Sequence, residues 1–244
     1  MVNENYECVV IGGSHAGLSA ALVLGRSLRR TLVIDADNPR NRPSREAHNF
    51  YSRDGQNPMD LIKLGKEQLT PYKTVECASG VVTGVVALDE GFSVEFDGRT
   101  LSATTLILAT GASDGMRDVP GYAELWGSRI LHCPYCHGFE AIGSRVGYVT
   151  PPGTITKYNT LLTHWYDDLV MFTNGQEFSA DELRRCADDN VRIVDGTIRS
   201  LTKAGGGITV TTDAEALEVG YLFWDSDKRY NTELTEQLGC ALVT

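Results

Sequence analysis

Residues 9–17 read Val9-Val10-Ile11-Gly12-Gly13-Ser14-His15-Ala16-Gly17 and join a predicted strand to a predicted helix. The strand, residues 7–11, is a short apolar run with β-branched residues, and residues 15–29 have helical periodicity. Gly12 permits a tight turn, Gly17 allows close packing of helix and strand, and the free amides of the first helical turn can face a pyrophosphate. This pattern predicts the glycine turn of a dinucleotide-binding domain.

Two further residues bear on this interpretation. Asp35 ends the next predicted strand, residues 31–35, about 20 residues after the turn, where a carboxylate can bind ribose hydroxyls. Ser14 departs from the pattern, because a glycine at this position lets the backbone approach a phosphate. The plain alternative is a glycine turn without a ligand. The residues alone leave FAD and NAD both open.

The composition is that of a globular chain of 244 residues, with 42% hydrophobic and 22% charged residues. This length can bury a core in one large or two small domains. A net charge of -10 without a basic run argues against nucleic-acid binding. The first residues lack the regions of a secretory signal, and no apolar run reaches the length of a membrane span. We therefore expect a cytoplasmic protein that binds neither membranes nor nucleic acids.

Later apolar patterns predict two α/β domains. Residues 38–57 read as a long irregular loop, and a Ser179–Glu182 capping box predicts a helix to residue 187. Further helices are expected at 59–69 and 155–166. Strands are expected at 81–88, 92–96, 105–110, 146–150, 168–173, 191–194, 198–201, 208–212 and 218–223. Gly, Asp and Pro cluster at 113–121, so we place the domains at 1–116 and 117–244.

A second motif, His132-Cys133-Pro134-Tyr135-Cys136-His137-Gly138, lies in the second domain. Cysteines at this spacing can close a disulfide ring, and a helix N-terminus would stabilise the first thiolate. The spacing also satisfies the haem c signature, which requires export, and could contribute to a zinc site, which requires further ligands. A glutaredoxin-type fold and a buried pair without chemistry would fit the spacing as well. The remaining cysteines are scattered, so redox chemistry is favoured and no metal is expected.

Taken in order and spacing, these motifs resemble the thioredoxin-reductase-like flavoproteins, in which an FAD domain is interrupted by a second nucleotide-binding-type domain with Cys-x-x-Cys. The resemblance includes the glycine turn, the Asp35 strand, His48-Asn49-Phe50 with Arg53-Asp54-Gly55, Ala109-Thr110-Gly111, Pro120-Gly121 and the Cys133 segment. Residues 132–140 are similar to a subgroup that includes fungal dithiol oxidases, which close disulfides in small metabolites. The resemblance implies two Rossmann-like three-layer domains and a homodimer.

It also implies FAD as the cofactor and a role for each cysteine. Cys136 would exchange electrons with the flavin, and Cys133 would react with the outside thiol. His137 replaces the aspartate of typical members, and an imidazole with a pKa near 6.5 suits an acid/base role, with simple packing as the alternative. The cofactor-binding residues expected from the resemblance are Gly12, Gly13, Ser14, His15, Ala16, Gly17, Asp35, His48, Asn49, Val82, Thr110 and Gly111.

The second domain departs from the family at its own nucleotide site. The strand at 146–150 is followed by Pro151-Pro152-Gly153-Thr154, in which two prolines remove amide donors. After the next strand, Phe172-Thr173-Asn174-Gly175 stands where family reductases present basic residues for the 2′-phosphate. We therefore expect that NADPH does not reduce this protein.

The chain ends near the point where family members return to their FAD domain. We therefore expect this domain to be incomplete at its C-terminus, with one wall of the flavin site missing and apolar surface exposed. The leading hypothesis is an FAD-linked dithiol/disulfide oxidoreductase. A small dithiol or a thioredoxin-like protein would react with the cysteines, and oxygen or a ferredoxin-like protein would be the other electron partner. The alternative is a truncated or degenerate relative that binds little flavin and has no catalytic role.

Overall fold

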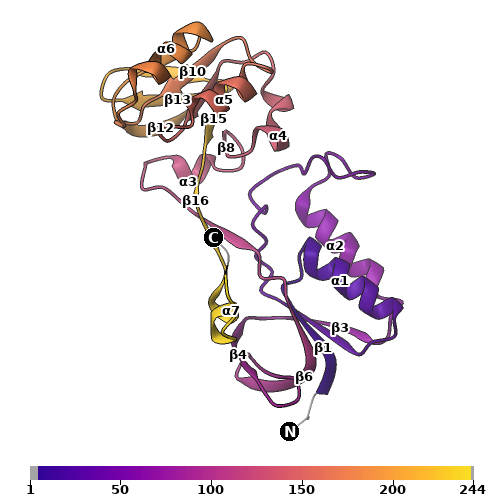
Figure 1. Ribbon diagram of the computed structural model, residues 1–244. Helices are drawn as coiled ribbons and strands as arrows, with labels where there is room; N and C mark the ends of the chain where they lie inside the picture. The colour runs from indigo at the N-terminus through magenta and orange to yellow at the C-terminus, as the bar shows by residue number, and fades with distance from the viewer. Residues whose placement is uncertain (1–4, 243–244) are drawn as a thin grey trace. The chain divides into compact units, whose positions relative to one another are not determined.

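The computed structural model describes residues 5–242, which form two compact units (Figure 1). Within the described residues, unit 1 contains 5–42, 56–113 and 229–242, and unit 2 contains 43–55 and 114–228. The chain passes between the units in β7 (Ala112–Gly115) and β16 (Asp227–Tyr230), which pair with each other. Residues 1–4 and 243–244 of the expected domains lie outside the described residues.

Unit 1 is built on a six-stranded sheet in the order β3-β2-β1-β6-β5-β4. The first four strands of this order are parallel, and β5 and β4 continue the sheet in antiparallel pairing. The strands are β1 (Asn5–Ile11), β2 (Thr31–Asp35), β3 (Val75–Ser79), β4 (Val82–Ala87), β5 (Phe92–Phe96) and β6 (Arg99–Leu108). The helices α1 (His15–Arg26) and α2 (Pro58–Leu69) lie side by side against this sheet (Figure 1).

Alternation along the parallel strands divides the core of unit 1 in two. Val10 of β1 and Val33 of β2 pack in one cluster with Leu18 of α1 and Ile62 of α2. Their neighbours in the strands, which include Val9 and Ile34, pack in a second cluster with Val85, Val94 and Phe96. Because both faces of the strands are buried, these segments read as continuous apolar runs.

The C-terminal segment adds a short helix to the second cluster of unit 1. In α7 (Glu233–Gln237), Leu234 is 8% exposed and belongs to this cluster, with Leu238 packed beside it. The side chain of Gln237 accepts a hydrogen bond of 2.9 Å from the backbone N–H of Val85 in β4. The return of the chain to unit 1 therefore begins within residues 229–242.

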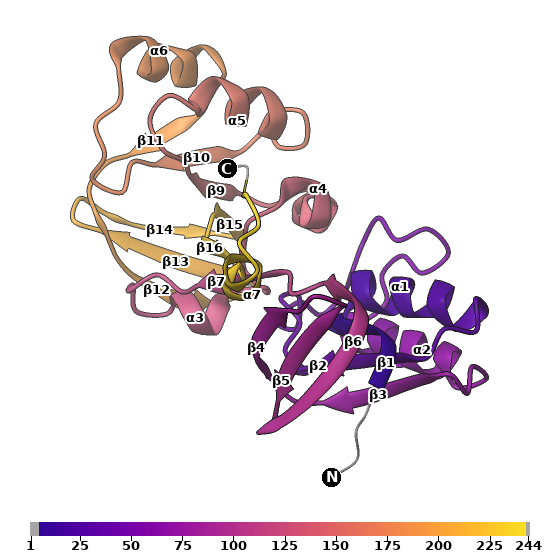
Figure 2. The same cartoon turned by 60° about the horizontal axis from the view of Figure 1, so that its bottom comes forward.

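Unit 2 has three layers, with a parallel five-stranded sheet in the middle (Figure 2). The sheet order is β11-β10-β9-β15-β8, with β8 (Ile130–Leu131), β9 (Val146–Val149), β10 (Leu169–Phe172), β11 (Arg192–Val194) and β15 (Tyr221–Trp224). One face is covered by α5 (Ile155–Leu162) and α6 (Ala180–Asp188). The other is covered by the antiparallel strands β12 (Ile198–Ala204), β13 (Gly207–Thr212) and β14 (Ala216–Val219). Both units thus confirm the predicted α/β fold class.

The structure corrects two details of the predicted organisation. The expected strand at 218–223 is wrong: β14 and β15 belong to different sheets and are separated at Gly220. A Cβ at Gly220 would lie 2.6 Å from the Ser144 Cβ, so the close approach of these segments requires glycine. The unit bounds also differ from 1–116 and 117–244, because residues 43–55 belong to unit 2 and residues 229–242 to unit 1.

Candidate functional site

The Cys133–Cys136 pair forms a disulfide at the start of a short helix in unit 2. Cys133 is the N-cap of α4 (Pro134–His137), and Pro134 occupies the first helical position, where a missing N–H costs nothing. The carbonyl of Cys133 accepts hydrogen bonds from the amides of Cys136 and His137. Tyr166 secures the other end of the helix, because its hydroxyl donates to the Gly138 carbonyl over 2.7 Å. The turn thus holds the two half-buried cysteines together.

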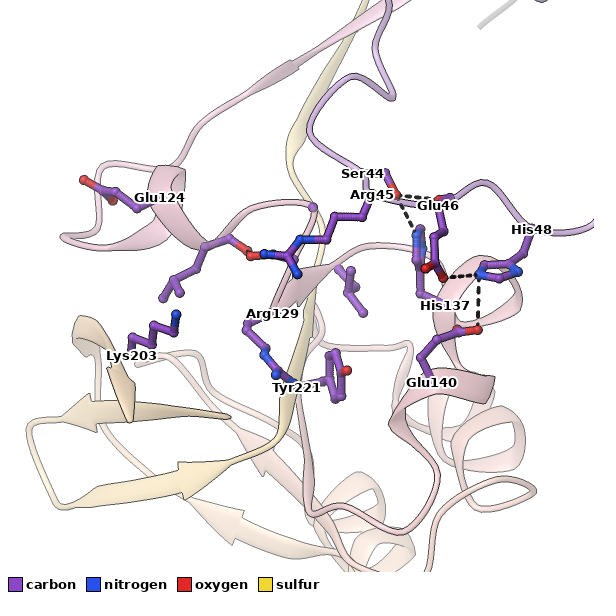
Figure 3. A pocket seen from close by; sticks show the side chains of 14 residues that line it. Ser44, Arg45, Glu46, His48, Glu124, Arg129, His137, Glu140, Lys203 and Tyr221 are labelled. Atoms are coloured by element: carbon purple, nitrogen blue, oxygen red, sulfur yellow. Dashed lines mark hydrogen bonds and ion pairs between the residues drawn. The ribbon is translucent and has the colours of Figure 1, made fainter. Parts of the chain in front are cut away.

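His137 contacts the loop at residues 43–55, which belongs to the same unit. Its Nε2 lies 2.9 Å from the Ser44 Oγ, and that hydroxyl lies 2.7 Å from the carbonyl oxygen of Glu46 (Figure 3). The Nδ1 of His137 is buried and has no hydrogen-bond partner among the described residues. Burial lowers the pKa of the His137 imidazole below its ordinary value, against the opposing effect of the Glu140 carboxylate. Burial therefore favours the neutral form of this imidazole.

His48 lies among carboxylates next to His137 (Figure 3). Its Nε2 is 3.2 Å from a carboxylate oxygen of Glu140 and 3.4 Å from one of Glu46, and its Nδ1 is 3.3 Å from Asp54. Burial alone would lower the pKa of His48, but these carboxylates raise it above the ordinary value. The two rings stand edge to face with centroids 6.2 Å apart. The site thus holds two histidines whose pKa values are displaced in opposite directions.

These side chains line a cavity of about 420 Å³ within unit 2. Figure 3 shows His137, His48, Glu46 and Glu140 gathered at one end of the group of lining side chains, with Lys203 at the other. Tyr135 and Phe139, which flank Cys136 and His137 in the chain, are 68% and 79% exposed. Two exposed aromatic side chains therefore lie close to the disulfide in the sequence, one in α4 and one in the 3-10 turn η1 (Phe139–Ala141).

The predicted glycine turn lies between β1 and α1 in unit 1, as expected. Gly12 has a φ of +104°, and a Cβ there would lie 2.2 Å from the carbonyl oxygen of Ala109. A Cβ at Gly17 would lie 1.7 Å from the Gly12 carbonyl oxygen. Ser14 is the N-cap of α1 but forms no side-chain capping bond, and its hydroxyl lies 3.3 Å from the His15 Nδ1. Ala16 is exposed in the first turn of the helix.

Four of the other predicted cofactor residues lie near this turn or near the end of β2. A Cβ at Gly13 would come within 2.8 Å of the Asp35 carboxylate, so the close approach of this side chain to the turn requires glycine. Thr110 follows β6 next to Gly12, and it exchanges two hydrogen bonds with Asn231. The Gly111 carbonyl accepts the Asn231 N–H. Val82 begins β4, two residues after Gly80, whose N–H donates to the Asp35 carbonyl.

The last two predicted cofactor residues, His48 and Asn49, lie in unit 2 instead. His48 contacts Glu140, and the Asn49 side chain donates to the Tyr135 carbonyl over 2.8 Å. Their described side-chain contacts are therefore with the loop and with the segment of the disulfide helix.

The second nucleotide-type turn, after β9 in unit 2, is occupied by the chain's own groups. The Gly153 N–H donates to the Glu182 carboxylate over 2.5 Å. The same carboxylate completes the predicted capping box with Ser179 at the start of α6, and these hydrogen bonds lower its pKa. The Thr154 hydroxyl donates to the Pro151 carbonyl. An anion of the protein thus takes the amide that a phosphate would need.

The sequence did not indicate the contacts of three residues, Ser44, Glu46 and Asn231. It predicted Glu182 in the capping box of α6 but not its hydrogen bond with the Gly153 N–H. Ser44 lies 93 residues from His137, and Asn231 lies 121 residues from Thr110. No local spacing reveals such contacts. Glu140 was apparent only as the end of the cysteine motif.

Neither a membrane span nor a metal centre is found among the described residues. None of their helices is long and apolar enough to span a bilayer. Among residues 5–242, no group of three or more His, Cys, Asp or Glu side chains is placed to hold a metal ion.

Comparisons with known proteins agree on a single family. The family model described as pyridine nucleotide-disulphide oxidoreductase matches residues 6–145. A protein named thioredoxin reductase aclD, from Aspergillus oryzae, is 32% identical, and the alignment covers 95% of this chain and 81% of the relative. The protein named thioredoxin reductase tcpT, from Claviceps purpurea, is 34% identical, and the alignment covers 72% of this chain and 58% of the relative.

Solved structures agree with these relatives. The crystal structure of HlmI superposes with a TM-score of 0.91 at 33% identity, covering 98% of this chain and 77% of that one. An oxidoreductase from Agrobacterium tumefaciens gives 0.89 at 35% identity, covering 98% and 81%. The chain therefore belongs to the pyridine nucleotide-disulphide oxidoreductases, within the thioredoxin-reductase-like FAD oxidoreductase family.

Proposed function

We propose that this protein is an FAD-linked dithiol/disulfide oxidoreductase that uses Cys133 and Cys136 and does not use NADPH. The observation that carries the proposal is the disulfide at the N-terminus of α4, with a half-buried histidine directly after it, whose pKa is lowered by burial. Disulfide exchange requires an accessible sulfur and a group that moves thiol protons. We propose that Cys133 supplies the sulfur and His137 moves the protons.

The exchange can be written with balanced atoms and electrons. A thiolate of the substrate attacks Cys133, and the bond between the cysteines breaks to leave a thiolate on Cys136. The second substrate thiol then displaces Cys133, so the substrate leaves as a disulfide and the protein keeps two thiols. His137 takes a proton from the attacking thiol and returns it to a cysteine sulfur. Two electrons and two protons thus pass to the protein, and the same steps run backwards if the cysteines are reduced first.

The residues of unit 1 fit the dinucleotide that this family uses. The Asp35 carboxylate lies at the end of β2 beside the glycine turn, where it suits ribose hydroxyls, and α1 carries no acidic residue in its first turn to oppose a pyrophosphate. We propose that Gly12 to Gly17, Asp35, Thr110 and Gly111 hold FAD. When bound, FAD would supply a two-electron acceptor for the cysteine pair.

The proposed independence of NADPH rests on the turn after β9. Pro151 and Pro152 have no N–H, and the Gly153 amide already donates to the Glu182 carboxylate. A dinucleotide phosphate entering this turn would meet a negative charge in place of a donor. After β10, the side chain of Asn174 accepts a hydrogen bond from the Ile198 N–H and offers no positive charge to a 2′-phosphate.

A visible absorption spectrum tests the proposal most directly. The purified chain should show flavin bands, or gain them after incubation with FAD and removal of the excess. Under anaerobic conditions dithiothreitol should then bleach these bands, and NADPH should leave them unchanged over the same time. A small dithiol is the first substrate to test, and a reduced thioredoxin the second.

Each result has a definite meaning. A preparation that stays colourless after incubation with FAD would contradict the enzyme and favour a relative without catalytic function. Rapid bleaching by NADPH would refute only the proposal about the second nucleotide turn. Bleaching by dithiothreitol that persists in a Cys133→Ser, Cys136→Ser double variant would remove the cysteines from the reaction.

A further inference from the structure

The contact between Ser44 and His137 determines which ring nitrogen carries the proton. The Ser44 hydroxyl has a single proton, and the carbonyl oxygen of Glu46 at 2.7 Å can only accept it. The Ser44 oxygen must then act as the acceptor toward the His137 Nε2 at 2.9 Å. Nε2 therefore carries the hydrogen, and in a neutral imidazole Nδ1 is left with a lone pair.

The state of Nδ1 points to a chemical role. It is buried and has no hydrogen-bond partner among residues 5–242. Unpaired buried polar atoms are rare, and each one in a folded protein calls for an explanation such as a catalytic role. A lone pair on the residue that directly follows Cys136 suits a group that receives a thiol proton.

We propose that Ser44 is a positioning residue: it holds His137 as the Nε2–H tautomer, so that Nδ1 is the atom that accepts and returns protons during thiol exchange. This inference rests on the proposed function, in which His137 moves thiol protons. Without the Ser44 acceptor, the ring would distribute its proton over both nitrogens. A fraction of the molecules would then present an N–H where a base is required.

The charges around His137 suit a base that cycles between neutral and charged forms. Among the described residues, those that act on it are Glu140 from η1 and Glu46 and His48 from the loop at 43–55. A protonated His48 opposes a second positive charge on His137, which favours the neutral resting form. The Glu140 carboxylate contacts His48 and stabilises a proton that arrives on His137.

The first experiment reads the tautomer without any reaction. Nitrogen-15 NMR of histidine-labelled protein at pH 7.5 distinguishes protonated from unprotonated ring nitrogens, and a His137→Gln variant assigns the signals. We expect a protonated Nε2 in the wild type and in Ser44→Thr, which keeps the hydroxyl. Ser44→Ala should shift His137 toward a mixture of tautomers. Ser144→Ala, which removes a comparable hydroxyl bond to the Ala141 carbonyl, is the matched control and should change nothing.

The second experiment measures the rate at which dithiothreitol reduces the Cys133–Cys136 disulfide, by counting free thiols after quenching, with no flavin needed. General base catalysis contributes about 10²- to 10⁴-fold, so a molecule with the wrong tautomer loses most of its rate, and an equal mixture of tautomers should slow Ser44→Ala about twofold at pH 7. The lower limb of the pH–rate profile should move in Ser44→Ala and return in Ser44→Thr. A loss of packing alone would slow the reaction equally at every pH.

Three results separate the possible failures. A wild-type His137 that carries its proton on Nδ1 overturns the assignment of Ser44, whatever the rates. A Ser44→Ala variant with the wild-type tautomer and pH profile overturns it as well. If the wild-type disulfide does not react with dithiols, the proposed function fails, while the NMR result still decides whether Ser44 sets the tautomer.

Discussion

Replacing Leu234 by alanine should destabilise unit 1 by about 2–3 kcal/mol. Leu234 is 8% exposed and packs in the cluster that contains Val85, Val94 and Phe96. Buried Leu→Ala substitutions cost about 2–5 kcal/mol, depending on how far the surroundings collapse into the space. The lower part of this range applies because α7 has only five residues and lies at the edge of the core, where it can shift to fill the cavity.

Urea unfolding can measure this loss, because the spectroscopic probes separate the units. The tryptophans Trp126, Trp165 and Trp224 all lie in unit 2, whereas far-UV circular dichroism reports both units. With a urea slope of about 1.5 kcal/mol/M, a loss of about 2.5 kcal/mol lowers the midpoint of unit 1 by about 1.7 M. Amide exchange in β4 and β5 reads the same change locally.

Leu242→Ala is the matched control, since Leu242 is 48% exposed and its truncation should change the midpoint little. The reasoning is refuted if Leu234→Ala is as stable as this control by circular dichroism and amide exchange. It is also refuted if the substitution lowers the tryptophan-detected midpoint and leaves exchange in β4 and β5 unchanged, because unit 2 would then carry the effect.

Three further predictions concern the sites. Gly17→Ala should abolish the retention of FAD, measured by absorbance after gel filtration, because the new Cβ would lie 1.7 Å from the Gly12 carbonyl oxygen. The control Gly206→Ala should retain the flavin, because the space around Gly206 is open. The raised pKa of His48 stabilises the folded state below about pH 6.5, and this contribution is lost as the pH rises through the folded-state value. The urea midpoint of unit 2, followed by tryptophan fluorescence, should therefore be lower in His48→Gln than in the wild type at pH 5.5, and the difference should be much smaller at pH 8.5. An equal difference at both pH values would contradict this prediction. In Cys136→Ser, the Cys133 thiolate should attack a disulfide reagent and release one of its thiols, which leaves a mixed disulfide on Cys133 that mass spectrometry detects. Labelling confined to the exposed Cys77 and Cys240 would exclude Cys133 as the reactive sulfur.

Local patterns were enough to predict most of the fold. The β1–α1 turn is recognisable because Gly12 and Gly17 are required by backbone contacts at the turn itself. The capping box at Ser179 is likewise a local device and occurs as predicted. The run at 218–223 misled because both of its strands are apolar, and only the contact of Gly220 with the distant Ser144 reveals the turn.

The candidate site was less accessible to sequence reasoning. The cysteine spacing predicted the disulfide segment, and the resemblance drew attention to His48. Neither indicated that the loop at 43–55 would bring Ser44 to the ring of His137, because that contact joins two segments that no periodic pattern connects. The assignment of the loop to unit 2 follows from these contacts.

The two glycine turns of the chain differ in the groups that they offer to a phosphate. In unit 1 the first turn of α1 carries no acidic side chain, and Ser14 forms no capping bond that would occupy its amides. In unit 2 the corresponding turn has two prolines, and Glu182 of the neighbouring helix binds the Gly153 amide. Removing the Glu182 carboxylate alone would free one donor but restore neither the missing N–H groups nor a positive charge after β10. Under the proposed function, the absence of nucleotide binding in unit 2 therefore rests on several positions, and the electrons of the cysteine pair come from, or go to, another partner.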